Sequence, residues 1–214
     1  MKKASNNILE NLFINYPMLV SCRDAIENAF EMLRQCYVNG GKVLICGNGG
    51  SAADSEHIVG ELMKDFLLKR KICSEDVQKI REAFPEDWEY LSGNLQGALP
   101  AISLVSQSSI SSAFINDVAA DMVFAQQVYG YIKEEDVVIG LSTSGNAKNV
   151  VNAIKIAKAM GAKTIGLTGE TGGRMKNLCD VYIKAPSEET YRIQEYHLPI
   201  YHALCAMIEI EVFT

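Results

Sequence analysis

The sequence predicts a doubly wound α/β fold of the flavodoxin type, in which helices flank a five-stranded parallel sheet. From residue 42 onward, short apolar segments alternate with segments of helical periodicity. The apolar segments are almost continuously hydrophobic, which is typical of strands that are buried on both faces of a parallel sheet. Alternation of such strands with helices favours a doubly wound domain. The length of 214 residues, with 48% hydrophobic and 21% charged residues, fits a single domain over 1–214.

The expected elements follow from these patterns. The strands are expected at 42–47, 101–106, 137–143, 163–169 and 180–186. Helices are expected between them at 51–66, 110–131, 146–160 and 188–213. Before the sheet, helical spacing over 5–38 with a break at Pro17, ended by Asn39-Gly40-Gly41, predicts an N-terminal helical arm over 1–41. Packing of this arm on a partner subunit and packing on its own domain are equally favoured.

One segment, residues 67–99, fits the alternation less well. It is more polar than its surroundings and contains Trp88, the single tryptophan. Ser74 is expected to cap a short helix that Pro85 ends. We interpret 67–99 as an inserted subdomain or lid.

The charge and the cysteines narrow the class of protein. A net charge of −6 disfavours a nucleic-acid-coating or membrane-binding surface, so neither nucleic acid nor membrane is expected as a partner. The N-terminus lacks the apolar run of a signal peptide, and no stretch is long enough to span a membrane. The six cysteines form no C-x-x-C pair. These features predict a reduced, cytoplasmic protein.

Two expected strands end in loops that suit an anion. The first loop holds Asn48, Gly49, Gly50 and Ser51, and the second holds Ser142, Thr143, Ser144, Gly145 and Asn146. Glycines let the backbone approach an anion, and a helix start offers free N–H groups. A third loop, 167–173, is a weaker signal. No nucleotide-binding motif occurs, so the two loops indicate a sugar phosphate and no nucleotide cofactor is expected.

Acid–base residues lie on two of the expected helices. His57 and Glu61 are four residues apart, which places them on one helix face; an ordinary surface pair is the alternative. On the last helix, Gln194 and His202 are separated by about 80° and can face one site. His197 and His202 are separated by about 140°, so we expect His197 to be structural.

Four segments carry a family resemblance. In chain order they are CGNGGSAADSEHIVGEL, FINDVAADMVFAQQV, GLSTSGNAKNVVNAI and RIQEYHLPIYHAL. Together they resemble the bacterial phosphoheptose isomerases, which belong to the sugar isomerase (SIS) domain superfamily. The resemblance covers nearly the whole chain except 67–99.

The resemblance implies a fold, a reaction and a site. It implies a SIS domain that interconverts sedoheptulose 7-phosphate and glycero-manno-heptose 7-phosphate, in a homotetramer with active sites at subunit interfaces. Glu61 and His202 match the catalytic positions. Zinc, where it is bound, would be held by residues matching His57, Glu61, Gln194 and His202. Substrate-binding positions are matched by Asn48, Gly49, Gly50, Ser51, Asp117, Ser142, Thr143, Ser144 and Gln194.

The sequence also departs from the family pattern. Asp65 stands where the family has an arginine, Tyr191 where it has an aspartate, and Ala147 where it has a serine. These departures bear on the identity of the substrate rather than on the type of reaction. Two alternatives therefore stay open: a non-catalytic SIS-domain regulator that binds a sugar phosphate, and an isomerase or lyase of a different sugar phosphate.

Overall fold

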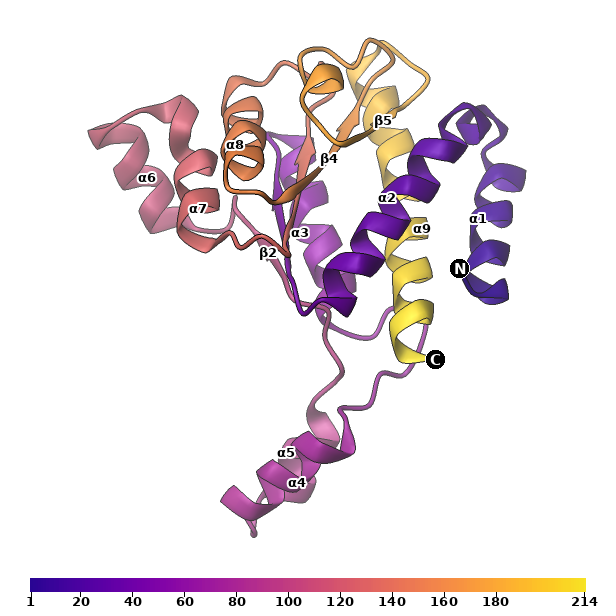
Figure 1. Cartoon of the computed structure of the whole chain (residues 1–214), viewed down its shortest axis with the longest axis vertical. Helices are drawn as coiled ribbons and strands as arrows, with labels where there is room; N and C mark the ends of the chain where they lie inside the picture. Colours follow the sequence, from indigo (N-terminus) through magenta and orange to yellow (C-terminus); the bar gives the residue numbers. More distant parts are fainter.

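The computed structural model describes residues 1–214 and is built around a five-stranded parallel sheet of order β2-β1-β3-β4-β5 (Figure 1). The strands are β1 Val43–Cys46, β2 Ala101–Ser103, β3 Val137–Leu141, β4 Lys163–Thr168 and β5 Val181–Lys184. This strand order is that of flavodoxin-like doubly wound folds. The predicted fold class is confirmed, and every strand lies inside its expected range.

Both faces of the sheet are buried, which explains why the strands are mostly apolar; the exposed lysines, Lys163 and Lys184, lie at strand ends. In β1, Val43 and Ile45 belong to the apolar core on one face, whereas Leu44 and Cys46 belong to the core on the other. Successive side chains of a strand point to opposite faces, so a strand between two helical layers needs apolar residues at every position. Because β1 pairs directly with β3, the loops that follow these two strands lie side by side.

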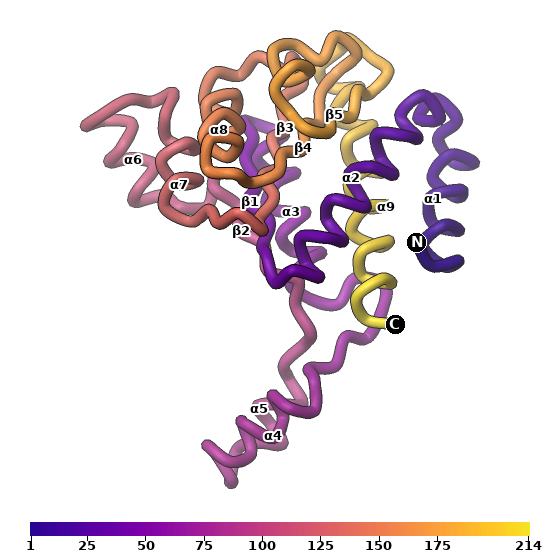
Figure 2. The backbone as a smooth tube through the Cα atoms, in the orientation of Figure 1, coloured from indigo at the N-terminus to yellow at the C-terminus, as the bar shows by residue number.

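Helices form a layer on each face (Figure 2). One layer contains α2 Arg23–Val38, α3 Gly50–Met63 and α9 Thr190–Phe213. The other contains α7 Val123–Tyr131 and α8 Lys148–Ala159. The first layer matters most here, because α3 and α9 pack together and carry all three histidines.

The N-terminal helices pack on their own chain. Helix α1, Lys3–Asn15, contacts α9 and buries Leu9, Leu12 and Phe13. The hydroxyl of Ser5 donates a hydrogen bond to Glu211 across this contact at 2.8 Å. The expected break at Pro17 is confirmed: Pro17 opens a short 3₁₀ segment, η1 Pro17–Cys22, which joins α1 to α2. The structure thus shows packing on its own domain, one of the two expected arrangements.

The continuous helix expected over 110–131 is wrong. The segment forms α6 Ser108–Asp117, the 3₁₀ turn η2 Ala120–Met122, and then α7. The backbone leaves the helical region at Val118 and Ala119, whose φ angles are −129° and −161°. The break separates a helix without buried residues, α6, from one that is packed into the core, α7.

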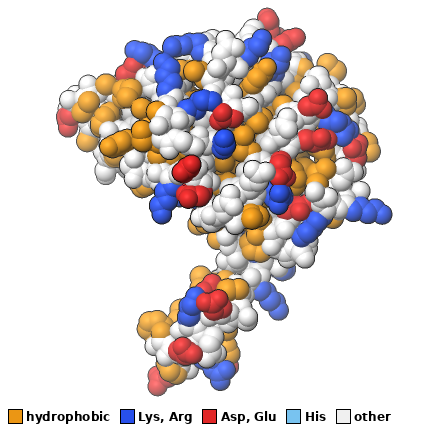
Figure 3. All heavy atoms as spheres, in the orientation of Figure 1, with side chains coloured by type: hydrophobic (Ala, Val, Ile, Leu, Met, Phe, Trp, Pro, Cys, Tyr) orange, Lys and Arg blue, Asp and Glu red, His pale blue; other side chains and the backbone are white.

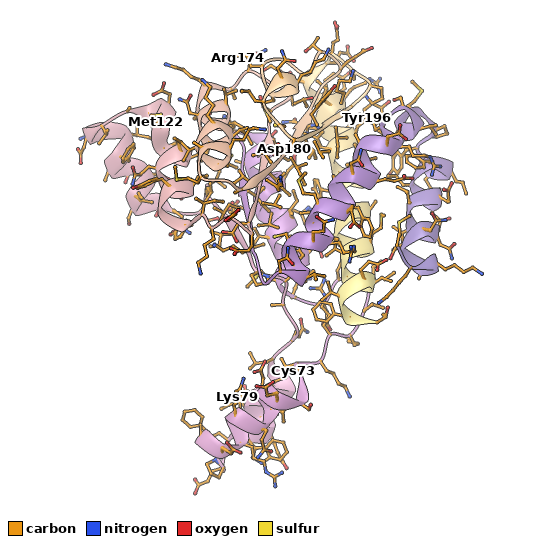
Figure 4. The ribbon with its side chains drawn as sticks, in the orientation of Figure 1. Cys73, Lys79, Met122, Arg174, Asp180 and Tyr196 are labelled. Carbon is orange, nitrogen blue, oxygen red and sulfur yellow. The ribbon has the colours of Figure 1, made fainter.

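The middle of the segment between α3 and β2 forms a second arm, which extends away from the body (Figure 1) and is called the arm below. It consists of α4 Ser74–Ala83 and α5 Trp88–Asn94, and neither helix contains a buried residue. Figure 4 shows Cys73 and Lys79 on this arm, far from the sheet. The helix ends before Pro85 as expected, but the predicted cap is wrong: Cys73 is the N-cap residue, and Ser74 begins the helix without a capping bond.

The surface is of mixed charge. Lysines and arginines alternate with aspartates and glutamates over the face seen in Figure 3. None of the helices combines the length and the apolar character needed to cross a membrane.

Candidate active site

A cavity of about 390 Å³ lies at the carboxyl ends of β1 and β3. It is bounded by the two small-residue loops and by the start of α9. Its lining residues are Asn48, Gly49, Gly50, Ser51, Leu141, Ser142, Thr143, Ser144, Ala147, Thr190 and Gln194. All the predicted loop residues of the substrate site except Asp117, together with Gln194, therefore meet around one cavity. Hydroxyl groups beside the positive end of α3 suit a phosphate.

Two glycines allow the first loop to take its shape. Gly49 precedes α3 with a φ of +57°, a conformation that residues with a side chain rarely adopt. At Gly50 a Cβ atom would lie 2.5 Å from Nε2 of Gln194. The absence of a side chain at Gly50 is thus what lets the Gln194 amide lie against the start of α3.

The second loop is held from two sides. The side-chain amides of Asn48 and Asn149 exchange two hydrogen bonds of 2.9 Å, which tie the first loop to the start of α8, the helix that follows the second loop. The third loop packs behind it, because Gly169 N–H donates to the carbonyl of Thr143 and Met175 N–H donates to that of Gly145. The third loop, 167–173, which is the weaker signal for an anion site, therefore supports the cavity from behind. Asn149, which the sequence did not single out, also helps to hold the cavity in shape.

A cluster of three acid–base side chains lies further along α3 and α9. Nε2 of His57 is 3.1 Å from Oε1 of Glu61, as their spacing predicted, and 3.4 Å from Nε2 of His202. One donor atom from each of the three lies within 4.8 Å of the others, a group that could hold a metal ion. The other carboxylate oxygen of Glu61, Oε2, is buried and accepts no hydrogen bond.

Tyr201 lies behind His57 and was not expected from the sequence. Its hydroxyl donates to Oδ1 of Asp54 at 3.3 Å and lies 3.0 Å from Nδ1 of His57. The ring of His57 has two neutral tautomers: with the proton on Nε2 it donates to Oε1 of Glu61, and with the proton on Nδ1 it donates to the hydroxyl of Tyr201. The second tautomer leaves the lone pair of Nε2 free for a metal ion between Glu61 and His202. Such second-layer hydrogen bonds are typical of histidines that bind metals.

Burial sets the electrostatics of the cluster. The pKa of His202 is below its ordinary value, mainly because burial disfavours the charged ring and also because His57 is close. The pKa values of Asp54 and Tyr201 are raised, again mainly by burial. At neutral pH His202 is therefore a neutral ring that can accept a proton or bind a metal ion.

Three predicted residues lie outside this cluster. His197 is fully buried, and its Nε2 is 3.2 Å from the carbonyl oxygen of Thr168, in agreement with a structural role. Gln194 lines the cavity, where its amide lies against Gly50 near the start of α3, about two turns before the three clustered side chains. Asp117 ends α6, is exposed, and accepts a hydrogen bond from the neighbouring Asn116, outside the cavity. Substrate binding by Asp117 stays a prediction.

Helices α3 and α9 run side by side in the same direction. Gly50 faces Gln194 near their beginnings, and His57 faces Tyr201 and His202 about two turns later. The contact between the two helices, called the seam below, thus extends from the candidate phosphate-binding cavity to the acid–base cluster. A cavity for an anion and a His/Glu/His group on one seam can serve a phosphorylated substrate whose reacting carbons lie away from its phosphate.

Known proteins agree with this arrangement. Two family models, each described as a SIS domain, match residues 18–85 and 111–209. The phosphoheptose isomerase of Clostridium acetobutylicum is 41% identical over 190 residues, covering 89% of this chain and 84% of the relative. That of Aneurinibacillus thermoaerophilus is 36% identical and covers 99% and 91% of the two chains. The solved phosphoheptose isomerase of Neisseria gonorrhoeae superposes with a TM-score of 0.70 at 31% identity, covering 97% of this chain and 92% of its own.

The sheet order, the cavity and these matches define a SIS-domain protein of the sugar-phosphate class. Sequence identity of 36–41% over most of both chains is enough to assign the family. The chain belongs to the phosphoheptose isomerase family.

Proposed function

We propose that the protein is an aldose–ketose isomerase of phosphorylated sugars, and that it interconverts sedoheptulose 7-phosphate and glycero-manno-heptose 7-phosphate. One observation carries the proposal: the buried Oε2 of Glu61, which accepts no hydrogen bond and has only Lys64 Nζ nearby at 3.8 Å, lies in a cluster with two imidazoles, beside the same pair of helices as the candidate phosphate-binding cavity. A module that only binds sugar phosphates needs the cavity but not this cluster.

The length of the seam suits a long sugar chain. Ser51 in the cavity and His57 in the cluster are six residues apart on α3, a rise of about 9 Å. A seven-carbon chain built from bonds of about 1.5 Å spans a similar distance. With its phosphate among Ser51, Ser142 and Ser144, an extended heptose phosphate can present C1 and C2 to Glu61 and His202.

The chemistry requires two proton movements. In the aldose-to-ketose direction, Oε2 of Glu61 takes the proton from C2, which leaves an enediolate with its negative charge on the oxygen of C1. His202 takes the proton of the C2 hydroxyl and gives it to the oxygen of C1, which a neutral ring with a lowered pKa can do. The oxygen of C2 then becomes the carbonyl as Glu61 returns its proton to C1.

The same residues fit a zinc ion. Two imidazoles and a carboxylate are ligands that zinc prefers, and one donor atom from each lies within 4.8 Å of the others. We propose His57, Glu61 through Oε1, and His202 as ligands; Gln194, the fourth ligand that the family resemblance implies, lines the cavity in this chain, and its role as a ligand stays a prediction. When bound, zinc would polarise the sugar oxygen next to the reacting carbons. Loss of activity with a chelator and recovery with Zn²⁺ would support this; chelator-resistant activity in metal-free protein would contradict it.

Further copies of the chain are part of the proposal. His202 also forms one wall of a largely apolar groove between α1 and α9, which includes the exposed Leu67 and Leu198. We propose a homotetramer in which a second copy covers this groove beside the active site. The molar mass from light scattering tests it, and a fully active monomer would contradict it. None of the six cysteines forms a disulfide, which supports a cytoplasmic location.

The decisive experiment compares wild type, Glu61→Gln and Glu56→Gln on C5, C6 and C7 sugar phosphates. Glu56 lies on the same helix, is exposed and stands outside the cluster, so its variant is a matched control. We expect turnover of the C7 substrate by wild type and Glu56→Gln, and none by Glu61→Gln, which should still bind the sugar phosphate. Equal turnover by Glu61→Gln would remove the assignment of the base. Binding without turnover by wild type would favour the regulator, and turnover of a shorter sugar alone would reassign the substrate.

A further inference from the structure

A buried ion pair lies directly behind Glu61. Nε of Arg70 is 2.6 Å from Oε1 of Glu209, and both side chains have zero exposed surface. Arg70 comes from the segment that leads into the arm, and Glu209 lies on α9. A buried pair of this kind contributes little net stability compared with apolar residues of the same volume, so its presence requires another explanation.

The remaining nitrogens of Arg70 bind the end of the helix that carries Glu61. Nη1 donates to the carbonyl of Leu62 at 2.6 Å, and Nη2 donates to the carbonyl of Glu61 itself at 2.8 Å. The last carbonyls of a helix have no partner within the helix. A planar guanidinium satisfies two of them together while a third nitrogen binds Glu209, a geometry that lysine cannot reproduce.

Glu209 completes the arrangement from the other side. Beyond Arg70, its carboxylate accepts hydrogen bonds from the N–H groups of Phe66, Leu67 and Leu68 at 2.9, 2.8 and 3.1 Å. Glu209 follows His202 by seven residues on α9, which is about two turns and therefore the same helix face. The ion pair thus joins the last turn of α3 to the face of α9 that carries His202.

The base of the arm is part of the same network. Arg70 N–H donates to Oδ1 of Asp65 at 2.7 Å, and the carbonyl of Arg70 accepts from Gly97 N–H at 2.8 Å. Oε1 of Gln96 accepts from Asp65 N–H at 2.9 Å. The Asp65 carboxylate therefore binds the backbone at the base of the arm. Arg70 is held both through its guanidinium group and through its own backbone N–H and carbonyl.

We propose that Arg70 and Glu209 are positioning residues that hold the Glu61 carboxylate at its working distance from His202. The inference rests on the proposed function of Glu61 and His202 as the acid–base pair. Arg70 holds Glu61 through its main chain, from behind, so neither Arg70 nor Glu209 needs to touch the substrate. A displacement of a reacting group by 1 Å reduces turnover by about 100-fold, so a support of this kind has a large effect on rate.

The test uses Arg70→Lys, Glu209→Gln and the double variant Arg70→Met/Glu209→Leu. For each, kcat and KM for the heptose phosphate are measured per folded enzyme, with Tm and a crystal structure. We expect kcat to fall about 10- to 100-fold while KM changes less than about threefold, because the phosphate cavity lies at the other end of α3. The double variant leaves no charge unpaired, but it removes the partners of two backbone carbonyls and three backbone N–H groups, so we expect both Tm and kcat to stay below wild type.

Asp136→Asn serves as the matched control. Asp136 is buried and pairs with Lys42 at 2.5 Å near the amino ends of β1 and β3, the end of the sheet opposite the cavity. It should lower Tm and leave kcat unchanged. A merely structural role of Arg70 predicts the same pattern for Arg70→Lys, and that result would overturn the proposal.

The crystal structures separate this proposal from the proposed function. We expect the Glu61 carboxylate of Arg70→Lys to be displaced from His202 relative to wild type. An unchanged separation overturns the positioning role whatever the activity. The carboxylate can also be displaced in Arg70→Lys while wild type shows no isomerase activity. In that case Arg70 still positions Glu61, and only the assigned reaction is overturned.

Discussion

The hydroxyl of Tyr201 lies 3.0 Å from Nδ1 of His57 and so holds that ring with Nε2 facing the cluster. The ring of Tyr201 is nearly fully buried, and the hydroxyl reaches Asp54 at the same time. A carboxylate, a phenol and an imidazole thus form one chain of hydrogen bonds that ends at the ring of His57. The residue next to His202 on α9 thereby orients His57 on α3.

Replacing Tyr201 by phenylalanine should weaken metal binding and turnover while keeping the fold. The apolar ring stays in place, and one hydrogen-bonded chain worth about 1 kcal/mol is lost. Loss of an outer-layer partner reduces metal affinity by about 10- to 100-fold. We expect a reduction of that size in Zn²⁺ affinity by calorimetry. Tyr196→Phe is the control, since Tyr196 is on the same helix (Figure 4) and outside the cluster. Equal Zn²⁺ affinities in both variants would contradict the role of Tyr201.

Gly50→Ala tests the place of Gln194 in the cavity. A Cβ atom at Gly50 would meet the terminal amide of Gln194 at 2.5 Å, and this flexible side chain, not the backbone, would have to move. We expect KM to rise about tenfold, equivalent to about 1.4 kcal/mol, with little change in Tm. Gly60→Ala is the control on the same helix, because a Cβ atom there meets nothing within 4 Å. It should raise stability by about 0.5–1 kcal/mol without affecting KM; a rise in KM for Gly60→Ala alone would contradict this assignment.

Much of this site was predictable because its signals are local. Each strand is apolar on both faces, and the loops after β1 and β3 carry the small and hydroxyl residues that an anion needs. The four-residue spacing of His57 and Glu61 places them in contact on any helix. Such features depend on neighbours in sequence, so composition and spacing suffice to find them.

The supports of the site were not predictable, because they depend on how two distant helices align. Tyr201 and His57 are separated by 144 positions, and Arg70 and Glu209 by 139. In the sequence, the basic run Lys69-Arg70-Lys71 favours a solvated surface, which is wrong for Arg70, whose side chain is buried; nothing in the sequence singles out Tyr201. Only the alignment of α3 with α9 shows that both are buried beside the catalytic candidates.

His197 predicts an acid sensitivity of folding. Burial lowers its pKa from the ordinary 6.5 to about 4. Below pH 6.5 the unfolded chain binds a proton that the folded protein does not bind until about pH 4, so stability falls over this range and then levels off. The loss from this residue amounts to about 3 kcal/mol. Urea unfolding of wild type and His197→Gln between pH 4 and 7 should show converging curves, with the variant less dependent on pH. Parallel curves would exclude this contribution.

The arm is expected to be dispensable for the fold of the body. No residue of α4 or α5 is buried, and the two ends of the arm are already joined, since Gly97 N–H donates to the carbonyl of Arg70 at 2.8 Å. Replacing 72–95 by a short glycine-containing turn should therefore leave Tm within a few degrees of wild type, while the contacts of Arg70, Gln96 and Gly97 remain.

Activity then distinguishes two roles of the arm. If the arm has no role in catalysis or assembly, kcat and KM of the shortened chain should be unchanged, because Arg70 still holds the carbonyls of Glu61 and Leu62. A lid, or a contact with another copy, predicts a higher KM or a smaller assembly by light scattering. A shortened chain that fails to fold would contradict the independence of the arm. Cutting the chain within the arm by limited proteolysis, which leaves every body residue in place, checks that result separately.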